Sequence, residues 1–105
     1  MTKTALIIGD SEENLNTIST QLEMCLDYNV ETAEPNEIRK YAGKIFDLVI
    51  IDGEINWEKS CFELYEQLQG ETKFIFTGKE KIVEEAKRRE QQAFLKDKSL
   101  LDILG

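Results

Sequence analysis

A short apolar run that ends in a carboxylate constrains the fold of this chain more than any other feature. Leu48–Ile51 is continuous and apolar, and Asp52 and Gly53 follow it directly. A run this short, without alternation, is typical of a strand buried on both faces, as in a parallel sheet. Open α/β sheets place their sites at the carboxyl ends of such strands. Asp52 is therefore the first candidate for a functional residue.

The rest of the chain predicts strands that alternate with helices. Further strands are expected over residues 4–8, 28–32, 73–76 and 93–95, and helices are expected to begin near residues 11, 35, 60, 80 and 99. Apolar and polar residues alternate over 28–32, which indicates an edge strand. Five strands alternating with five helices predict an α/β three-layer sandwich, in which helices cover both faces of a five-stranded parallel sheet.

Composition narrows the function. The chain has 105 residues, which predicts a single domain over 1–105. Its net charge of -8 argues against a direct nucleic-acid surface. With no apolar run of membrane-spanning length and no signal-like N-terminus, we expect a soluble, cytoplasmic protein without membrane contact. Histidine is absent, and Cys25 and Cys61 are expected as buried free thiols on apolar helix faces.

Four polar residues stand at or just after the ends of predicted strands one, three, four and five. They are Asp10, Asp52, Thr77 and Lys96. Because all strands of a parallel sheet end at one edge, these residues are expected to converge. Two carboxylates and a backbone carbonyl suit Mg²⁺, and a carboxylate can attack phosphorus to give an acyl phosphate. An ammonium group and a hydroxyl then suit the phosphoryl oxygens.

Each of the four residues also has a simpler interpretation. Asp10 could stabilise a helix N-terminus, and Asp52 could form a turn before glycine. Thr77 could simply end a strand, and Lys96 could lie in solvent. The order acid, acid, hydroxyl, lysine at four strand ends favours function over coincidence.

The sequence resembles a response-regulator receiver domain, the phospho-accepting module of two-component phosphorelay signalling. The resemblance covers residues 3–105, and four stretches carry it: I-I-G-D-S-E-E-N (7–14), D-L-V-I-I-D (47–52), F-I-F-T-G (74–78) and F-L-K-D (94–97). It implies a flavodoxin-like sandwich with strand order 2-1-3-4-5.

The resemblance also implies roles and partners. Asp52 would be the phospho-acceptor, and Asp10, Asp52 and the backbone carbonyl of Glu54 would hold Mg²⁺. Thr77 would be the switch hydroxyl, and Lys96 would pair with the phosphoryl group. A histidine kinase or phosphotransfer protein would be the donor. An output domain or a second copy of the chain is a further candidate partner.

The sequence departs from the family at its margins. Most family members have two adjacent acids after strand one, and here Gly9 stands in place of the first. Asn56 replaces the proline that usually lies four residues after the phospho-acceptor, and Ala93 replaces the usual aromatic switch residue. The neighbouring Phe94 is expected to point to the other face of its strand. The last helix is short for the family.

A basic run, Lys87-Arg88-Arg89, is either a solvated helix face or a partner surface. The solvated helix face is the favoured interpretation. The partner surface is the alternative, because receiver domains, which this chain resembles, commonly signal through this region.

Two other functions stay open. A degenerate receiver would act as a phosphorylation-independent interaction module, and the changes at Gly9, Asn56 and Ala93 favour it. A dehalogenase-type phosphatase is the other, but it needs an acid two residues before the nucleophile, where this chain has Ile50. No glycine-rich nucleotide-binding motif is present. We therefore expect a signalling domain rather than a turnover enzyme.

Overall fold

The computed structural model describes residues 3–41, 43–53 and 61–104. Its elements run β1 (Lys3–Ile8), α1 (Glu12–Cys25), β2 (Tyr28–Ala33), η1 (Pro35–Lys40), β3 (Ile45–Asp52), α2 (Cys61–Gln67), β4 (Gln69–Thr77), α3 (Glu80–Arg88), β5 (Ala93–Leu95) and α4 (Leu100–Leu104). The predicted alternation of strands and helices is therefore confirmed.

Within these residues, five parallel strands form one sheet in the order β2-β1-β3-β4-β5. This confirms the predicted topology and the edge position of β2. Each strand follows its neighbour in the same direction, so β1, β3, β4 and β5 all end at one edge. Asp52, Thr77 and Lys96 lie at or next to that edge as a direct result.

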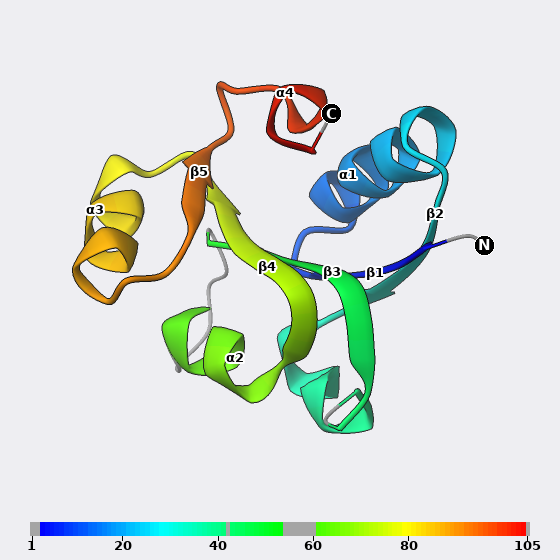
Figure 1. Cartoon of the computed structure of the whole chain (residues 1–105), viewed down its shortest axis with the longest axis horizontal. Helices are drawn as coiled ribbons and strands as arrows, with labels where there is room; N and C mark the ends of the chain where they lie inside the picture. Colours follow the sequence, from blue (N-terminus) through cyan, green and yellow to red (C-terminus); the bar gives the residue numbers. More distant parts are fainter. Residues whose placement is uncertain (1–2, 42, 54–60, 105) are drawn as a thin grey trace.

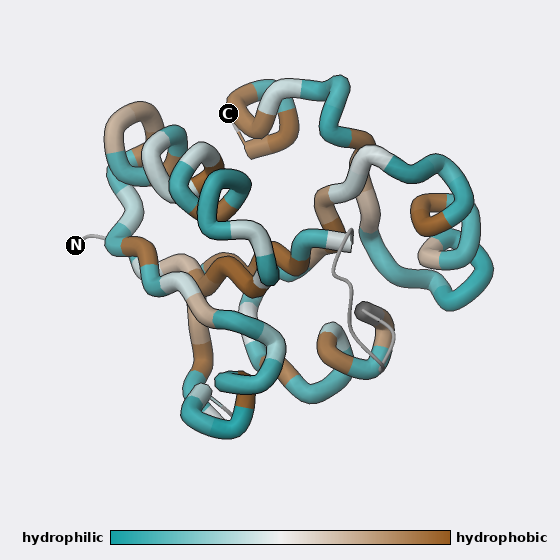
Figure 2. The backbone as a smooth tube through the Cα atoms, turned by 180° about the vertical axis from the view of Figure 1, so that it is seen from behind, coloured by the Kyte–Doolittle hydropathy of each residue, from teal (hydrophilic) through white to brown (hydrophobic). Residues whose placement is uncertain are grey.

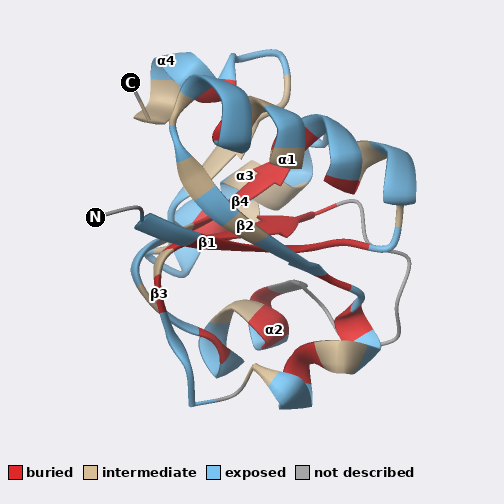
Figure 3. Ribbon diagram, turned by 90° about the vertical axis from the view of Figure 1, so that its right-hand side faces the viewer, coloured by how far each residue is buried: buried red, intermediate tan, exposed pale blue. Residues whose placement is uncertain are grey.

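Helices cover both faces of the sheet (Figure 1). One face packs against α1 and α4, with Ile7 and Ile50 of the sheet meeting Leu22 and Leu100. The other face packs against η1, α2 and α3. The central strands are the most apolar part of the backbone trace (Figure 2), and they lie as a buried layer between helices (Figure 3). The predicted three-layer sandwich is confirmed, and α4 has only five residues.

Helix α1 begins where the sequence predicted a helix start, near residue 11. Ser11 is the N-cap, and its Oγ accepts a hydrogen bond from the backbone N–H of Asn14 at 3.4 Å. Glu12 and Glu13 lie in the first turn, where the positive end of the helix dipole favours acids. This cap fixes the first turn of α1 beside the end of β3.

Several local expectations are wrong or incomplete. Cys25 is exposed rather than buried, because the following residue Leu26 packs against the apolar cluster and completes the stripe. The short helix after Pro35 is 3-10 rather than α. The fourth strand begins at Gln69, four residues earlier than predicted. The side chain of Cys61 lies outside the described part of the structure.

None of the described helices combines the length and the apolar character that crossing a lipid bilayer requires.

Candidate phospho-acceptor site

Asp52 is the buried centre of the site. It is the last residue of β3, pairs with Phe76 of β4 in the sheet register, and is 1% exposed. Burying a carboxylate without partners is costly, so its surroundings must supply donors. Gly53 follows, and its N–H donates to the carbonyl of Phe76 at 3.3 Å. The chain therefore leaves the sheet immediately after the carboxylate.

Lys96 supplies a positive charge at Asp52. Its Nζ donates to Oδ1 of Asp52 at 3.1 Å, and the two side chains are 25% and 1% exposed. The backbone explains this approach, because the N–H of Lys96 donates to the carbonyl of Thr77 at 2.8 Å. That bond holds the start of the β5–α4 connection against the end of β4. Lys96 therefore contacts a residue 44 positions away in the sequence.

Asn14 supplies a second donor that the sequence analysis did not identify. Its Nδ2 donates to Oδ2 of Asp52 at 3.3 Å. A carboxylate only accepts, so the amide must turn its nitrogen toward Asp52. A signal was present in the sequence: Asn14 lies one turn before Ile18, on the face of α1 that packs on the sheet. A polar residue on that face, in the turn nearest the carboxyl edge, is a candidate for the site.

Thr77 is fully buried at the end of β4. Its Oγ1 accepts a hydrogen bond from the backbone N–H of Lys79 at 3.1 Å. Because a hydroxyl can donate while it accepts, its proton remains able to reach another oxygen. Gly53 packs tightly here, since a Cβ on it would lie 2.9 Å from Cβ of Thr77. Asp52 and Thr77 thus end neighbouring strands in close packing.

Asp10 lies at the same edge but is exposed. It follows Gly9, whose N–H donates to the carbonyl of Ala33 at 3.1 Å. A Cβ on Gly9 would lie 3.3 Å from Cβ of Asp52 and 3.2 Å from Cδ2 of Leu15. The backbone before Asp10 therefore packs directly against Asp52, and an acid in place of Gly9 would require its neighbours to shift by a few tenths of an ångström.

The donors at this edge suit Mg²⁺ better than a softer metal. Asp10 and Asp52 offer hard carboxylate oxygens, and the chain has no histidine. No group of three or more acidic, cysteine or histidine residues gathers as a metal cluster within ranges 3–41, 43–53 and 61–104. Mg²⁺ does not need one, because it keeps several waters. The predicted third ligand, the carbonyl of Glu54, and Asn56 lie outside the described residues.

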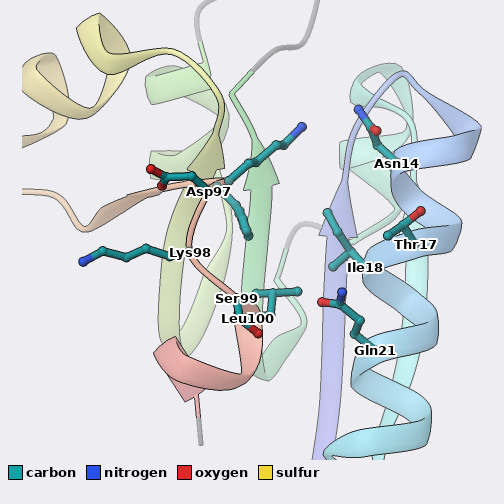
Figure 4. A pocket seen from close by; sticks show the side chains of 10 residues that line it. Asn14, Thr17, Ile18, Gln21, Asp97, Lys98, Ser99 and Leu100 are labelled. Atoms are coloured by element: carbon teal, nitrogen blue, oxygen red, sulfur yellow. The ribbon is translucent and has the colours of Figure 1, made fainter.

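A cavity of about 330 Å³ lies between α1 and the β5–α4 connection. Its walls include Asn14 and Thr17 of α1, Phe76 of β4, and Lys96 and Ser99 of the β5–α4 connection. Figure 4 shows Asn14 and Thr17 on α1 across the cavity from the segment that carries Ser99. Two of the wall residues, Asn14 and Lys96, donate hydrogen bonds to Asp52. The cavity therefore reaches residues that contact Asp52.

Ala93 and Phe94 of β5 pack on opposite faces of the sheet, as predicted. Ala93 packs in the cluster that contains Ile75 and Ala86. Phe94 packs in the opposite cluster, edge-on to Phe74 with ring centroids 5.3 Å apart. No aromatic residue stands at the usual switch position, because that position is Ala93.

The basic run lies partly in intramolecular contacts. Arg88 and Arg89 both pair with Glu85, at 3.2 Å and 3.1 Å. The guanidinium of Arg89 also lies 4.7 Å from the ring centroid of Phe62, and Lys87 is exposed. Lys87 and Arg88 remain the more accessible part of the predicted partner face.

A comparison with solved structures agrees with this architecture. No protein-family profile and no curated protein sequence matches the chain. Among solved structures, it is similar to a CheY-like response regulator receiver domain protein from Methanospirillum hungatei. The two superpose with a TM-score of 0.71 at 21% sequence identity, over 99% of this chain and 89% of that one. The chain has the receiver-domain fold.

The receiver-domain fold is in general that of a signalling module rather than of a turnover enzyme. A dehalogenase-type phosphatase needs an acid two residues before its nucleophile, and at that position the chain has Ile50, which is fully buried in the sheet.

Proposed function

We propose that this chain is a response-regulator receiver module in which Asp52 accepts a phosphoryl group. The observation that carries the proposal is the contact of a 1% exposed carboxylate with the ammonium group of Lys96 at 3.1 Å, at the carboxyl edge of the sheet. A buried acid at the end of β3 and a partly buried lysine just after β5 have little structural need to meet there. Replacing such a pair by apolar residues is often neutral or stabilising, which favours a chemical role.

The donor would be a phosphohistidine on a histidine kinase or phosphotransfer protein, since this chain has no histidine of its own. An oxygen of Asp52 attacks phosphorus, and the bond between phosphorus and the donor nitrogen breaks with its electron pair on nitrogen. Lys96 then stabilises the added negative charge, and the Thr77 hydroxyl donates to a phosphoryl oxygen. Mg²⁺, held by Asp10, Asp52 and the Glu54 carbonyl, would supply further charge neutralisation.

Signalling would follow from the charge that arrives. A phosphoryl group carries about −1.5 to −2 charges at neutral pH, and the carboxylate gives up its own single charge. The site therefore gains up to about one negative charge, beside residues that carry positive charge and a hydroxyl proton. Movement of Thr77 toward that group would alter the start of the β4–α3 connection, because Lys79 is bonded to its hydroxyl. An output domain or a second copy of the chain would read this change, with Lys87 and Arg88 on a candidate contact face.

Labelling with acetyl phosphate and Mg²⁺, followed by intact-mass measurement, tests the proposal. We expect one phosphoryl group on the wild type, none on Asp52→Asn, and none when EDTA removes the metal. An unlabelled wild type, or equal labelling of Asp52→Asn, would sink the proposal.

A second candidate is an interaction module that works without phosphorylation. Gly9 and Ala93 favour it, because the tight packing at Gly9 leaves little room for the usual second acid and Ala93 supplies no aromatic switch. Beryllofluoride, a phosphoryl mimic, separates the two functions. NMR shifts at Thr77 and Lys96 on addition of beryllofluoride and Mg²⁺ support the receiver, whereas an unchanged spectrum supports the second candidate.

A further inference from the structure

We infer that the side-chain amide of Asn14 is a functional residue of this site, which shortens the life of the acyl phosphate by favouring the free carboxylate of Asp52. The inference rests on the proposed function and extends it to a residue that the receiver resemblance does not assign. Its basis is the hydrogen bond from Nδ2 of Asn14 to Oδ2 of Asp52 at 3.3 Å.

The position of Asn14 is built into the helix rather than left to chance. Its backbone N–H donates to Oγ of the N-cap Ser11, and the backbone N–H of Leu15 donates to the carbonyl of Ser11 at 3.0 Å. Leu15 itself is buried against the sheet. The first turn of α1 is therefore fixed on both sides of Asn14. Its side chain is partly buried, so the contact with Asp52 is sheltered from bulk water.

Lys96 and Asn14 donate to different oxygens of the carboxylate. Lys96 bonds to Oδ1 and Asn14 bonds to Oδ2. Phosphorylation turns one oxygen into the bridging oxygen of an acyl phosphate and leaves the other as a neutral carbonyl. Neutral oxygens accept weaker hydrogen bonds than a carboxylate does. The amide of Asn14 thus stabilises the free carboxylate more than the phosphorylated form.

Hydrolysis restores the charge that Asn14 favours. A water oxygen bonds to phosphorus, the bond from phosphorus to the Asp52 oxygen breaks, and its electron pair returns to the carboxylate. Both protons of the water leave with the phosphate as H₂PO₄⁻, and one then equilibrates with solvent. As negative charge develops on Asp52, the hydrogen bond from Asn14 strengthens. Loss of the amide should slow this decay about fivefold, from the usual difference between charged and neutral hydrogen bonds.

Two variants separate this effect from a change in water access. Asn14→Leu removes the donor and keeps the volume, whereas Asn14→Ala removes the donor and opens space toward the cavity. Both should slow the decay of phosphorylated Asp52 by a similar factor. Asn16→Leu makes the same change at an exposed position of the same helix, and its decay should match the wild type.

The experiment labels each protein with acetyl phosphate and Mg²⁺, removes the donor, and follows loss of the phosphoryl group by intact mass. Slower decay in both Asn14 variants supports the inference. Wild-type decay in both, or faster decay in Asn14→Ala with slower decay in Asn14→Leu, overturns it while the proposed function stands.

A second measurement does not depend on phosphorylation. It therefore distinguishes failure of the inference about Asn14 from failure of the proposed function. In the NMR spectrum of the unlabelled protein, a side-chain N–H of Asn14 should resonate downfield and shift when Asp52 is changed to Leu. If the wild type takes no label, the proposed function fails. An Asn14 amide signal that Asp52→Leu leaves in place overturns the inference whatever the labelling result.

Discussion

The ion pair between Lys96 and Asp52 should be measurable in the stability of the fold. Its atoms are 3.1 Å apart, with side chains 25% and 1% exposed. At this distance the Coulomb attraction is about 5 kcal/mol for an effective dielectric constant of about 20. Desolvation of the two charges offsets part of that attraction. We therefore expect a coupling free energy of about 2–3 kcal/mol between the two side chains.

A double-mutant cycle measures this coupling. It compares Lys96→Met, Asp52→Asn and the double variant by urea unfolding, with EDTA present so that no metal contributes. In the wild-type background, Lys96→Met leaves a buried carboxylate without its ammonium group. In the Asp52→Asn background it does not, because the amide carries no charge. The cycle removes the effect of the lost lysine stem, which is common to both backgrounds.

The expected result is that Lys96→Met costs about 2–3 kcal/mol more in the wild type than in Asp52→Asn. At a urea slope of about 1.5 kcal/mol per molar, Lys96→Met should lower the unfolding midpoint by about 1.3–2 M more in the wild type than in Asp52→Asn. Equal costs in both backgrounds would refute the reasoning, because the ion pair would then contribute nothing to the folded state.

Three further predictions follow from local contacts. Gly53→Ala should lower the free energy of unfolding by about 1–3 kcal/mol, because its Cβ would lie 2.9 Å from Cγ2 of Ile75; urea unfolding without loss would contradict it. The pKa of Glu37 is held below 4.5 in the folded protein by the backbone N–H of Glu34 and by Lys40. Glu37 therefore stabilises the fold at pH values above 4.5, and this contribution is lost as the pH falls through the pKa of Glu37 in the folded state. The difference in melting temperature between wild type and Glu37→Gln should therefore shrink between about pH 7 and about pH 3, and a constant difference would count against this. Exposed Cys25 should be alkylated in the native protein, with Cys25→Ser changing stability by less than about 0.5 kcal/mol; labelling only after unfolding would contradict the exposure.

Much of the fold could be predicted because short buried strands leave a strong pattern. Continuous apolar runs such as Leu48–Ile51 need cover on both faces, and the half-polar strand at Tyr28 needs only one covered face. These requirements, with the resemblance, predicted the strand order that the structure has. Lys96 could be predicted at Asp52 for a related reason, since parallel strands bring their carboxyl ends together whatever the loop lengths.

Features that depend on competition between neighbours could not be predicted. Gly70 follows a helical stripe, a position where glycine commonly ends a helix, but it lies within β4. Because Gly70 has no side chain, Val49 packs closely against it: a Cβ on Gly70 would lie 2.8 Å from Cγ2 of Val49. Cys25 was predicted to be buried, but it is exposed, and the adjacent Leu26 packs against the apolar cluster instead. Only the packed structure decides which of two adjacent apolar residues faces the core.

Asn14 shows the same limit at the site itself. Its residue type is common on helix surfaces, and only the crossing of α1 over the end of β3 brings its amide to Asp52. The resemblance named the acid, hydroxyl and lysine because those residue types recur in order. It assigned no role to Asn14, although the matching stretch 7–14 ends at this residue.

Chemical mapping of the phosphorylated residue tests the central claim most directly. Borohydride reduces an aspartyl phosphate to homoserine, which peptide mass spectrometry then locates in the sequence. After incubation with acetyl phosphate and Mg²⁺, the account predicts homoserine at position 52 and at no other aspartate. Homoserine at a different aspartate, or none in the labelled wild type, would contradict it.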